Sequence, residues 1–421
     1  MAQTTAGFKS AGLCGPMIRY DVSPWLERVA RRSQPIFARQ RGPLTVDVVV
    51  IGGGLAGCLA AYELRRAGAR VALVEGGRIG QGATAASLGT IAPGPGAPFL
   101  TLRERHGLRI ARSMWEATRR SALDFMALVR RLRLQCDLVS CDQLQIATSD
   151  DQADAFEREY AALTDAGFEA AWLAPPRLRE GLGIEALGAL KLPGAGLVDP
   201  YRACLAVARL ASRDGALVFE QTEARRITTA RRGVEVLTAA GALTAAAVVV
   251  ATGAPAPRLG PLERHFRVEE PYAVALPAVT PARRRAFGKT TAIAGDGATP
   301  PHAWRWTRDG RLIFCGASGA PVAAREREPT VVRRTGQLMY ELSLFYPHVS
   351  GTLPETGWAV RAVSTADGVM VAGTHRGFPR HLFALGLGRC GASAAWLAGR
   401  VLARGWAGAA SKGDELFGFI R

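Results

Sequence analysis

The segment from Val46 to Gly68 constrains the fold more than any other part of the chain. It begins with an apolar, β-branched run, Val46 to Ile51, which is typical of a strand buried on both faces. The turn GGGLAG follows at once, and the next residues predict a helix from about Leu55 to Ala67 that ends at Gly68. The run RVALV then predicts a second, parallel strand. This order of elements opens a doubly wound α/β sheet.

The glycines of this turn have the spacing of a dinucleotide-binding site. Gly52, Gly54 and Gly57 form the pattern G-x-G-x-x-G. The first permits a tight turn, the second lets a pyrophosphate approach the backbone, and the third lets the helix pack closely. The helix N-terminus then presents free N–H groups and a partial positive charge to the phosphates. The candidate cofactor contacts in this turn are Gly52, Gly54, Leu55, Ala56 and Gly57.

Two features beyond the turn bear on which nucleotide binds. Glu75 ends the second strand, where its carboxylate can accept hydrogen bonds from ribose hydroxyls and would repel the 2'-phosphate of NADP. The run GGRIGQGATAASLGT follows, and its residues are too small to build a core. They let a flat ring system and its ribityl chain lie against the backbone, although a flexible surface loop is the alternative interpretation. The candidate contacts in this run are Gly82, Ala83, Thr84, Ser87 and Gly89.

Two later stretches favour FAD over NAD. A buried strand predicted over 247–250 is followed by Ala251, Thr252 and Gly253. These small residues again let the backbone after a strand approach a bound cofactor closely. Near the C-terminus, HLFALGLGRCGASAAWLAGRVLARG predicts a strand, a glycine turn and a helix. A helix N-terminus at this turn can stabilise the negative charge of a reduced flavin. The candidate contacts in the turn are Gly386, Gly388 and Gly391.

With these pieces in order, the chain resembles the FAD-dependent oxidoreductases of the D-amino-acid oxidase class, and within it the gamma-glutamylputrescine oxidase-like branch. The likeness rests on VVVIGGGLAGCLAAYELRRAGARVALVEGGRIGQGA, GLVDPYRACLAVARLASRDGALVFEQTEA, VVVATGA, DGRLIFCG, TADGVMVAG, the glycine turn and the tail DELFGFIR. The resemblance implies FAD, with a further contact at Ala224. It also implies oxidation of an amine or amino acid to an imine, with dioxygen as the electron acceptor and hydrogen peroxide as product.

The chain departs from this branch at two places beside the expected flavin. The branch's loop resembles GASGRNGG, but residues 83–89 lack its arginine and asparagine. The C-terminal turn reads GLGRCG and lacks two histidines of the branch. Two alternatives therefore stay open: a flavin dehydrogenase that passes electrons to a quinone or a protein, and a basic flavoprotein with reduced turnover and a binding role.

The pattern predicts a discontinuous Rossmann-like FAD-binding domain and a second α+β substrate domain built on an antiparallel sheet. Amphipathic helical patterns in 101–185 and alternating, aromatic strands in 265–362 distinguish the second domain. Residues 1–16 are expected to be disordered, whereas Tyr20 and Trp25 are expected to pack on the body. The predicted division is an N-terminal arm, 1–44; an FAD-binding domain, 45–100, 190–262 and 364–421; and a substrate domain, 101–189 and 263–363.

The second domain also carries the candidates for catalysis. His302, Trp304 and Trp306 alternate along a predicted strand and so share one face. That face is either an aromatic wall that holds a cationic amine or simply core. Arg361 can form a bidentate pair with a substrate carboxylate, or a surface salt bridge. Residues 359–364, where some members of the class attach flavin to a cysteine, contain none, so the FAD is expected to be noncovalent.

Composition adds limits on partners and location. The chain has 53 Lys and Arg against 36 Asp and Glu, but the basic residues are scattered, so we expect no nucleic-acid partner. The seven cysteines form no CxxC pair, so we expect neither disulfides nor a metal site, and a cytoplasmic protein. No apolar run is long enough for a transmembrane segment.

Overall fold

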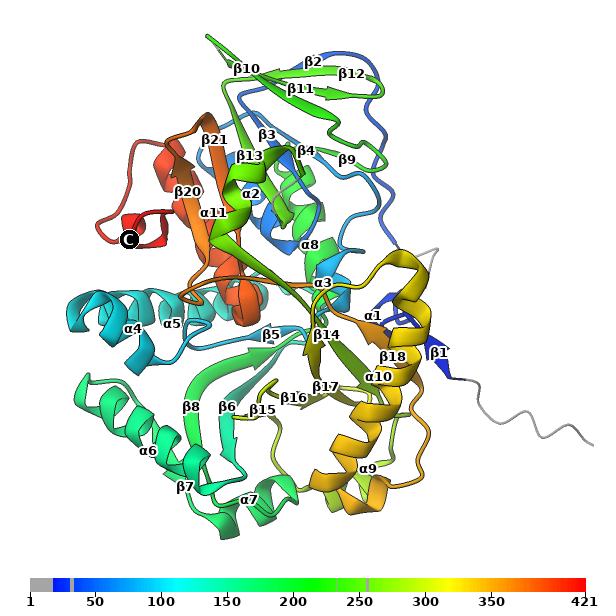
Figure 1. Cartoon of the computed structure of the whole chain (residues 1–421). Coiled ribbons are helices and arrows are strands. Elements are labelled where there is room, and N and C mark those ends of the chain that lie inside the picture. Colours follow the sequence, from blue (N-terminus) through cyan, green and yellow to red (C-terminus); the bar gives the residue numbers. More distant parts are fainter. Residues whose placement is uncertain (1–17, 31–33, 232, 255–256) are drawn as a thin grey trace, which may run out of the picture.

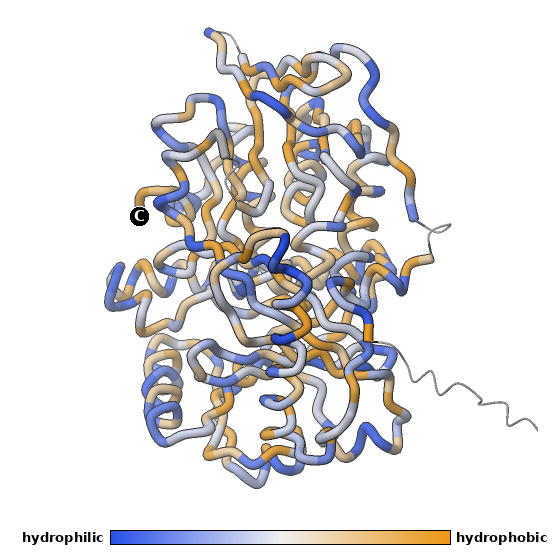
Figure 2. The backbone as a smooth tube through the Cα atoms, turned by 45° about the vertical axis from the view of Figure 1, so that its right-hand side comes forward, coloured by the Kyte–Doolittle hydropathy of each residue, from blue (hydrophilic) through white to orange (hydrophobic). Residues whose placement is uncertain are grey.

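The computed structural model of the chain describes residues 18–30, 34–231, 233–254 and 257–421. Within these residues the strands form three sheets, which we call the parallel, small and large sheets. Figure 1 shows the parallel and small sheets in the upper half of the molecule and the large sheet in the lower half. In Figure 2, hydrophobic stretches run through the interior of both halves. The disorder predicted for residues 1–16 concerns residues outside the described ones.

The parallel sheet is built from the apolar runs that predicted buried strands. Its central strand β3 (Val48–Ile51) pairs in parallel with β4 and β13, and every residue of β3 and β4 is buried. Only β20 runs antiparallel, beside β21, among its described strands. In spatial order the strands are β20 (Val371–His375), β21 (Phe378–Leu385), β13 (Ala247–Gly253), β3, β4 (Val71–Val74) and β9 (Leu217–Phe219).

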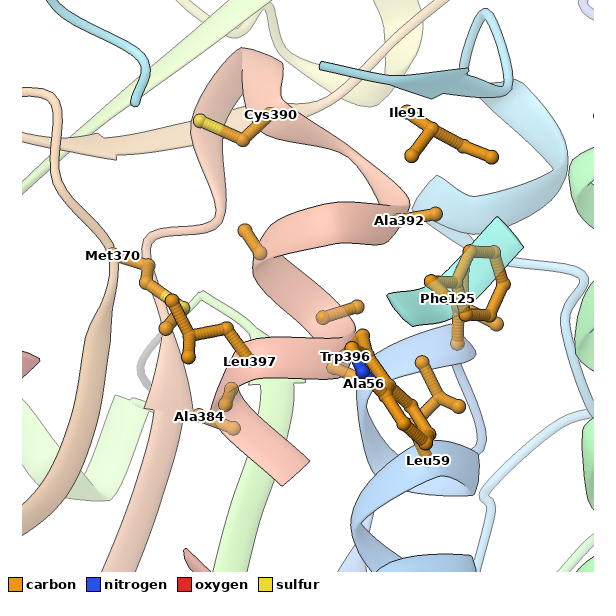
Figure 3. Close-up of a cluster of buried hydrophobic side chains, with 14 of the residues drawn as sticks. Ala56, Leu59, Ile91, Phe125, Met370, Ala384, Cys390, Ala392, Trp396 and Leu397 are labelled. Atoms are coloured by element: carbon orange, nitrogen blue, oxygen red, sulfur yellow. The ribbon is translucent and has the colours of Figure 1, made fainter. Parts of the chain in front are cut away.

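Helices α2 (Leu55–Arg66), α8 (Pro200–Arg213) and α11 (Ala392–Trp406) pack with this sheet, and α2 contacts both α8 and α11. The predicted helix at 55–67 is confirmed as α2. The α2–α11 contact is close because a Cβ at Gly399 would lie 3.1 Å from the backbone carbon of Leu59. Trp396 of α11 packs against Phe125 of α5 (Leu108–Arg131) in the same hydrophobic cluster (Figure 3). The two glycine-turn helices are therefore held in one rigid core.

The small sheet lies at the outer end of the parallel sheet. Val234 and Val236 belong to one hydrophobic cluster with Val49 of β3. Its strands are β10 (Arg226–Ala230), β11 (Gly233–Thr238), β12 (Gly241–Ala245) and β2 (Leu44–Thr45).

The large sheet provides the antiparallel framework predicted for the second half. β14 pairs antiparallel with β17, β18 and β19, and β6 with β8. Along its main path the strands are β1 (Arg19–Tyr20), β18 (Thr356–Ala359), β14 (Phe266–Ala275), β17 (Leu312–Gly319), β16 (Ala303–Trp306), β15 (Ala292–Asp296), β6 (Val139–Ala147), β8 (Gly188–Leu197) and β5 (Thr90–Ile91), while β19 (Ala362–Thr365) joins β14 and β7 (Ala171–Leu173) joins β8. The α/β fold class is confirmed.

The remaining helices lie around these sheets. α10 contacts β14, β17 and β18 of the large sheet, and its Leu338 packs in one cluster with Phe314. These helices are α1 (Pro24–Glu27), α3 (Ala83–Ala86), α4 (Phe99–His106), α6 (Asp150–Asp165), α7 (Pro175–Leu182), α9 (Pro281–Arg284) and α10 (Ala324–Phe345). Across the described ranges, none of the helices has both the length and the apolar character needed to cross a membrane.

Two observations bear on the predicted division of the chain. The boundary at residue 190 falls inside β8, which pairs with β6 in the large sheet. The N-terminal arm contributes strands to two sheets, because Tyr20 pairs with Gly357 and Leu44 with Leu243. Trp25 is fully buried, which confirms the expectation that it packs on the body.

Candidate active site

The glycine turn after β3 has no room for side chains at its first and third glycines. Gly52 has a φ of +109°, and a Cβ there would lie 2.5 Å from the Ala251 carbonyl oxygen of β13. A Cβ at Gly57 would lie 1.9 Å from the Gly52 carbonyl oxygen. The turn, the first turn of α2 and the end of β13 are therefore in direct backbone contact. Such a cradle lets a ligand reach the N-terminus of α2.

The N-terminus of α2 keeps part of its hydrogen-bonding capacity for a ligand. The Leu55 N–H donates to the Thr84 hydroxyl at 3.0 Å. Ala56 and Gly57 follow in the first turn, where N–H groups have no intrahelical partner. Gly54 lies beside the same hydroxyl, 3.2 Å from where its Cβ would be. Thr84 thus joins the small-residue loop to the N-terminus of α2.

Glu75 braces the turn from the end of β4. Its carboxylate oxygens accept hydrogen bonds from the N–H groups of Gly53 and Gly77, both at 2.7 Å. Its carbonyl accepts from the Thr222 N–H at 2.7 Å, which brings the half-buried Ala224 into the same neighbourhood. Glu75 is only partly buried, so its carboxylate stays accessible to a ribose.

The remaining predicted contacts surround the small-residue loop 82–89, which we call the flavin loop. Gly82 precedes α3, Ala83 begins it, and the Ser87 hydroxyl closes it by donating to the Thr84 carbonyl at 2.8 Å. A Cβ at Gly89 would lie 2.3 Å from the Val198 carbonyl oxygen, so the loop ends against the chain that leaves β8.

The C-terminal glycine turn reaches the same loop. Gly386, Gly388 and Gly391 all have positive φ, and Gly391 forms a β-bridge with Ile91. At the end of β13, Gly253 has a φ of +80° and the exposed Thr252 hydroxyl donates to the Ala254 carbonyl at 2.6 Å. The structure therefore brings the C-terminal turn to the strand that follows the flavin loop, as FAD binding across both would require.

A cavity of about 300 Å³ lies between the flavin loop and the large sheet. α3 and the residues before it form one side. Residues of β14 and β18, together with the segments that follow β17 and β18, form another. The Arg327 guanidinium, at the rim, pairs with the Asp21 carboxylate at 2.7 Å and 3.0 Å. The lining residues are Asp21, Ser23, Leu26, Gln81, Gly82, Ala83, Ala85, Ala86, Glu270, Pro321, Val322, Arg327, Trp358, Ala359 and Arg361.

Two residues of opposite charge lie side by side in this cavity. Glu269 pairs with Ala362 and Tyr272 with Ala359, so Glu270 and Arg361 are neighbours on adjacent antiparallel chains. Glu270 is 5% exposed and accepts a hydrogen bond from the Tyr272 hydroxyl at 3.0 Å. Burial, and then this carboxylate, raise the pKa of Tyr272 to about 12, so the phenol keeps its proton.

Arg361 contributes a positive charge to the cavity. It is exposed in the cavity, and within the described residues no carboxylate lies at ion-pair distance from its guanidinium. A positive charge without a protein counter-ion, beside a buried carboxylate, suits a ligand that carries both charges.

The other two predicted catalytic residues do not line this cavity. Trp304 is 2% exposed and packs on Phe345 with ring centroids 4.8 Å apart, in one cluster with Trp306. The His302 ring lies between the Asp296 and Glu341 carboxylates, with nitrogen–oxygen distances of 2.6 Å and 3.1 Å. The shared face of this strand is thus mostly core, and catalytic roles for His302 and Trp304 stay predictions.

The His302 cluster gives a prediction about stability. Burial alone would lower the pKa of His302, but its hydrogen bonds and charge interactions with Asp296 and Glu341 outweigh burial and raise it above 6.5. The protonated ring therefore stabilises the fold fully below pH 6.5, and this contribution disappears as pH rises through the raised pKa. We expect the free energy of unfolding, measured by urea denaturation, to fall over that interval more in the wild type than in His302→Asn. Equal pH dependence of the two proteins would contradict the pairing.

Sequence patterns did not single out three residues that shape this region. Glu270 and Arg305 are charged residues at buried positions, which only the strand register places near the flavin loop. The Ser23 hydroxyl donates to the Ala85 carbonyl at 2.5 Å, although Ser23 belongs to the predicted N-terminal arm. Arg305 could have been noticed in the sequence because it stands between two tryptophans, in WRW, within a predicted aromatic strand.

Known proteins match both the sequence and the fold. A family model described as FAD dependent oxidoreductase matches residues 47–404. A glycine oxidase of Geobacillus kaustophilus is 32% identical over 51% of this chain and 56% of that protein, and a gamma-glutamylputrescine oxidoreductase of Escherichia coli is 27% identical over 50% of each. A probable oxidoreductase of Haemophilus influenzae is 25% identical over 86% of this chain and 84% of its own length.

Solved structures agree over longer spans. The crystal structure of the Geobacillus kaustophilus glycine oxidase matches with a TM-score of 0.70 and 24% identity, covering 86% of this chain and 94% of that one. An L-proline dehydrogenase from P. horikoshii matches with a TM-score of 0.74 and 20% identity, covering 90% and 98%. These structures show the fold, and the family model over residues 47–404 identifies FAD as the cofactor. The chain belongs to the FAD-dependent oxidoreductase family of the D-amino-acid oxidase class.

Proposed function

We propose that the protein oxidises the C–N bond of a small amino acid to an imine and passes the electrons to dioxygen, forming hydrogen peroxide. The observation that carries this proposal is the position of Glu270 and Arg361 on adjacent chains in a cavity bordered by the flavin loop. A bound FAD supplies the acceptor for the hydride that leaves the substrate carbon.

Arg361 would hold the substrate carboxylate. Its guanidinium can form two parallel hydrogen bonds with a carboxylate, which fixes the position and the direction of the substrate. The cavity volume of about 300 Å³ suits a small ligand. This arrangement would turn the substrate's C–N bond toward the flavin loop and gain rate by orientation.

Glu270 would accept the substrate's ammonium proton. Oxidation requires a neutral nitrogen, because its lone pair forms the C=N bond as the hydride leaves the carbon. The Glu270 carboxylate already accepts one hydrogen bond from Tyr272 and can take a proton or a second donor from the ligand. Ala83, Ala85 and Ala86 offer no competing polar side chain on the opposite side.

The test is anaerobic mixing of the FAD-loaded protein with a panel of amino acids and matched amines, followed by admission of air. We expect bleaching near 450 nm, rapid recovery in air, and peroxide in amounts equal to the substrate consumed. Bleaching without recovery would favour a dehydrogenase that uses a quinone or protein acceptor. Absence of bleaching by every amine would contradict the oxidation itself and leave a binding role.

The noncovalent attachment of FAD has an independent readout. Acid precipitation should release all of the flavin into the supernatant, because a noncovalent cofactor has no bond to the protein. Flavin retained in the acid precipitate would overturn the noncovalent assignment.

Replacing Glu270 with glutamine should lower kcat/KM about tenfold, because an amide cannot accept the ammonium proton. The loss should shrink as pH rises and free substrate loses its proton in solution. A matched control is Glu269→Gln, since that neighbour does not line the cavity. An E270Q enzyme with the wild-type pH profile would exclude this role.

A further inference from the structure

Side chains from outside the flavin loop hold five successive carbonyls of that loop. The Ser23 hydroxyl donates to the Ala85 carbonyl at 2.5 Å. The indole N–H groups of Trp358 and Trp25 donate to the Ala86 and Ser87 carbonyls at 2.8 Å and 2.9 Å. The Arg305 Nη1 donates to the Leu88 and Gly89 carbonyls at 2.7 Å and 3.1 Å. These four donor residues, Ser23, Trp25, Arg305 and Trp358, are the carbonyl clamp.

The donors come from separate parts of the chain. Ser23 and Trp25 belong to the N-terminal segment at α1, which comes before every strand of the parallel sheet in the sequence (Figure 1). Arg305 lies on β16 and Trp358 on β18, both in the large sheet. A loop built of small residues has few contacts of its own to fix its path, so its conformation depends on these donors.

Arg305 is the unusual member of the clamp. Its side chain is 3% exposed, and its guanidinium donates to the carbonyls of Leu88, Gly89 and Val198 rather than to a carboxylate. It also lies 5.2 Å from the centre of the Trp25 ring, which links two members of the clamp. Burial lowers the pKa of Arg305 to about 10, so the side chain is still cationic at neutral pH.

We propose that the carbonyl clamp positions the flavin loop, and that Arg305 sets both the affinity for FAD and its reduction potential. Carbonyl oxygens that already accept hydrogen bonds from the clamp would oppose the negative charge of a reduced flavin less than free carbonyls would. The buried guanidinium adds a positive charge close behind the loop, which favours the electron-rich reduced form. The inference rests on FAD and not on the substrate proposed above.

The test compares Arg305→Gln, Arg305→Lys and Trp25→Phe with the wild type, without any substrate. We expect R305Q to bind FAD about tenfold more weakly, since it loses charge-assisted hydrogen bonds. We expect its midpoint potential, measured by equilibration with a redox dye, to fall by about 30 mV, which is a tenfold change for a two-electron couple. R305K should recover most of the potential, because it keeps the charge, but not the affinity.

Arg284 provides a matched control. Its guanidinium also donates to backbone carbonyls, those of Gly288 and Thr290 at 2.7 Å and 3.2 Å, but in a loop remote from the flavin loop. Arg284→Gln should lower the melting temperature and leave the affinity and the potential unchanged. A folded R305Q protein with wild-type affinity and potential would overturn the proposal. If R305Q does not fold, W25F decides: it keeps an aromatic ring but loses the indole N–H together with the pyrrole ring, so unchanged FAD affinity in W25F would overturn the proposal equally.

Discussion

Replacing Gly57 with alanine is expected to weaken FAD binding at least about a hundredfold and to give a colourless protein after purification. The new Cβ would lie 1.9 Å from the carbonyl oxygen and 3.1 Å from the carbonyl carbon of Gly52, and both are backbone atoms that cannot rotate away. Relief requires α2 to move off the turn, and overpacking of this kind costs about 1–3 kcal/mol or more. The N–H groups of Ala56 and its neighbours would then leave the position in which we expect them to bind the pyrophosphate. Flavin content and fluorescence titration with FAD measure the effect.

Gly405 of α11 is the control for this substitution. A Cβ there meets no heavy atom within 4 Å, so Gly405→Ala gains helix propensity, about 0.5–1 kcal/mol, without a clash. Two glycine-to-alanine changes within helices should thus shift the melting temperature in opposite directions. A G57A protein that purifies yellow with wild-type affinity would show that the contact between α2 and the turn is not what shapes the phosphate site.

The cofactor half could be predicted because its signals are local. β3 is buried over its whole length, and α2 begins at Leu55 as the glycine pattern requires. In these elements the same residues determine both the local conformation and the predicted contact with the cofactor. Neighbouring strands then follow from the right-handed connections of a doubly wound sheet.

The substrate side could be predicted only in part, because its site depends on register between distant strands. Alternation correctly placed Trp304 and Trp306 on one face, but it does not say which face of the sheet meets the flavin loop. In the structure those two rings join the core, and Arg305, on the opposite face, reaches the loop. Glu270 approaches Arg361 only through the pairing of β14 with β18 and β19.

Replacing Arg361 with alanine should reduce kcat/KM for amino acids about a hundredfold or more. The guanidinium lines the cavity as a charge without a protein counter-ion, so a substrate carboxylate would be its main partner. Each hydrogen bond to a charged group contributes about 1.5–3 kcal/mol, so the loss of a bidentate pair accounts for a factor of this size. Arg361→Lys should recover only part of this loss, because an ammonium keeps the charge and lacks the planar fork. Steady-state oxygen uptake with each variant measures both effects.

The substrate itself provides the sharper control, because an amine without the carboxylate has nothing for Arg361 to bind. For such an amine, wild type and R361A should differ little in kcat/KM, whereas the amino acid with the same side chain should lose the full factor. Arg327 separates this effect from the general charge of the cavity, since its guanidinium is already paired with Asp21 and Arg327→Lys should be nearly silent. If R361A lost equal activity toward both substrates, Arg361 would act on the fold or on FAD, and the carboxylate would have to be recognised elsewhere in the cavity.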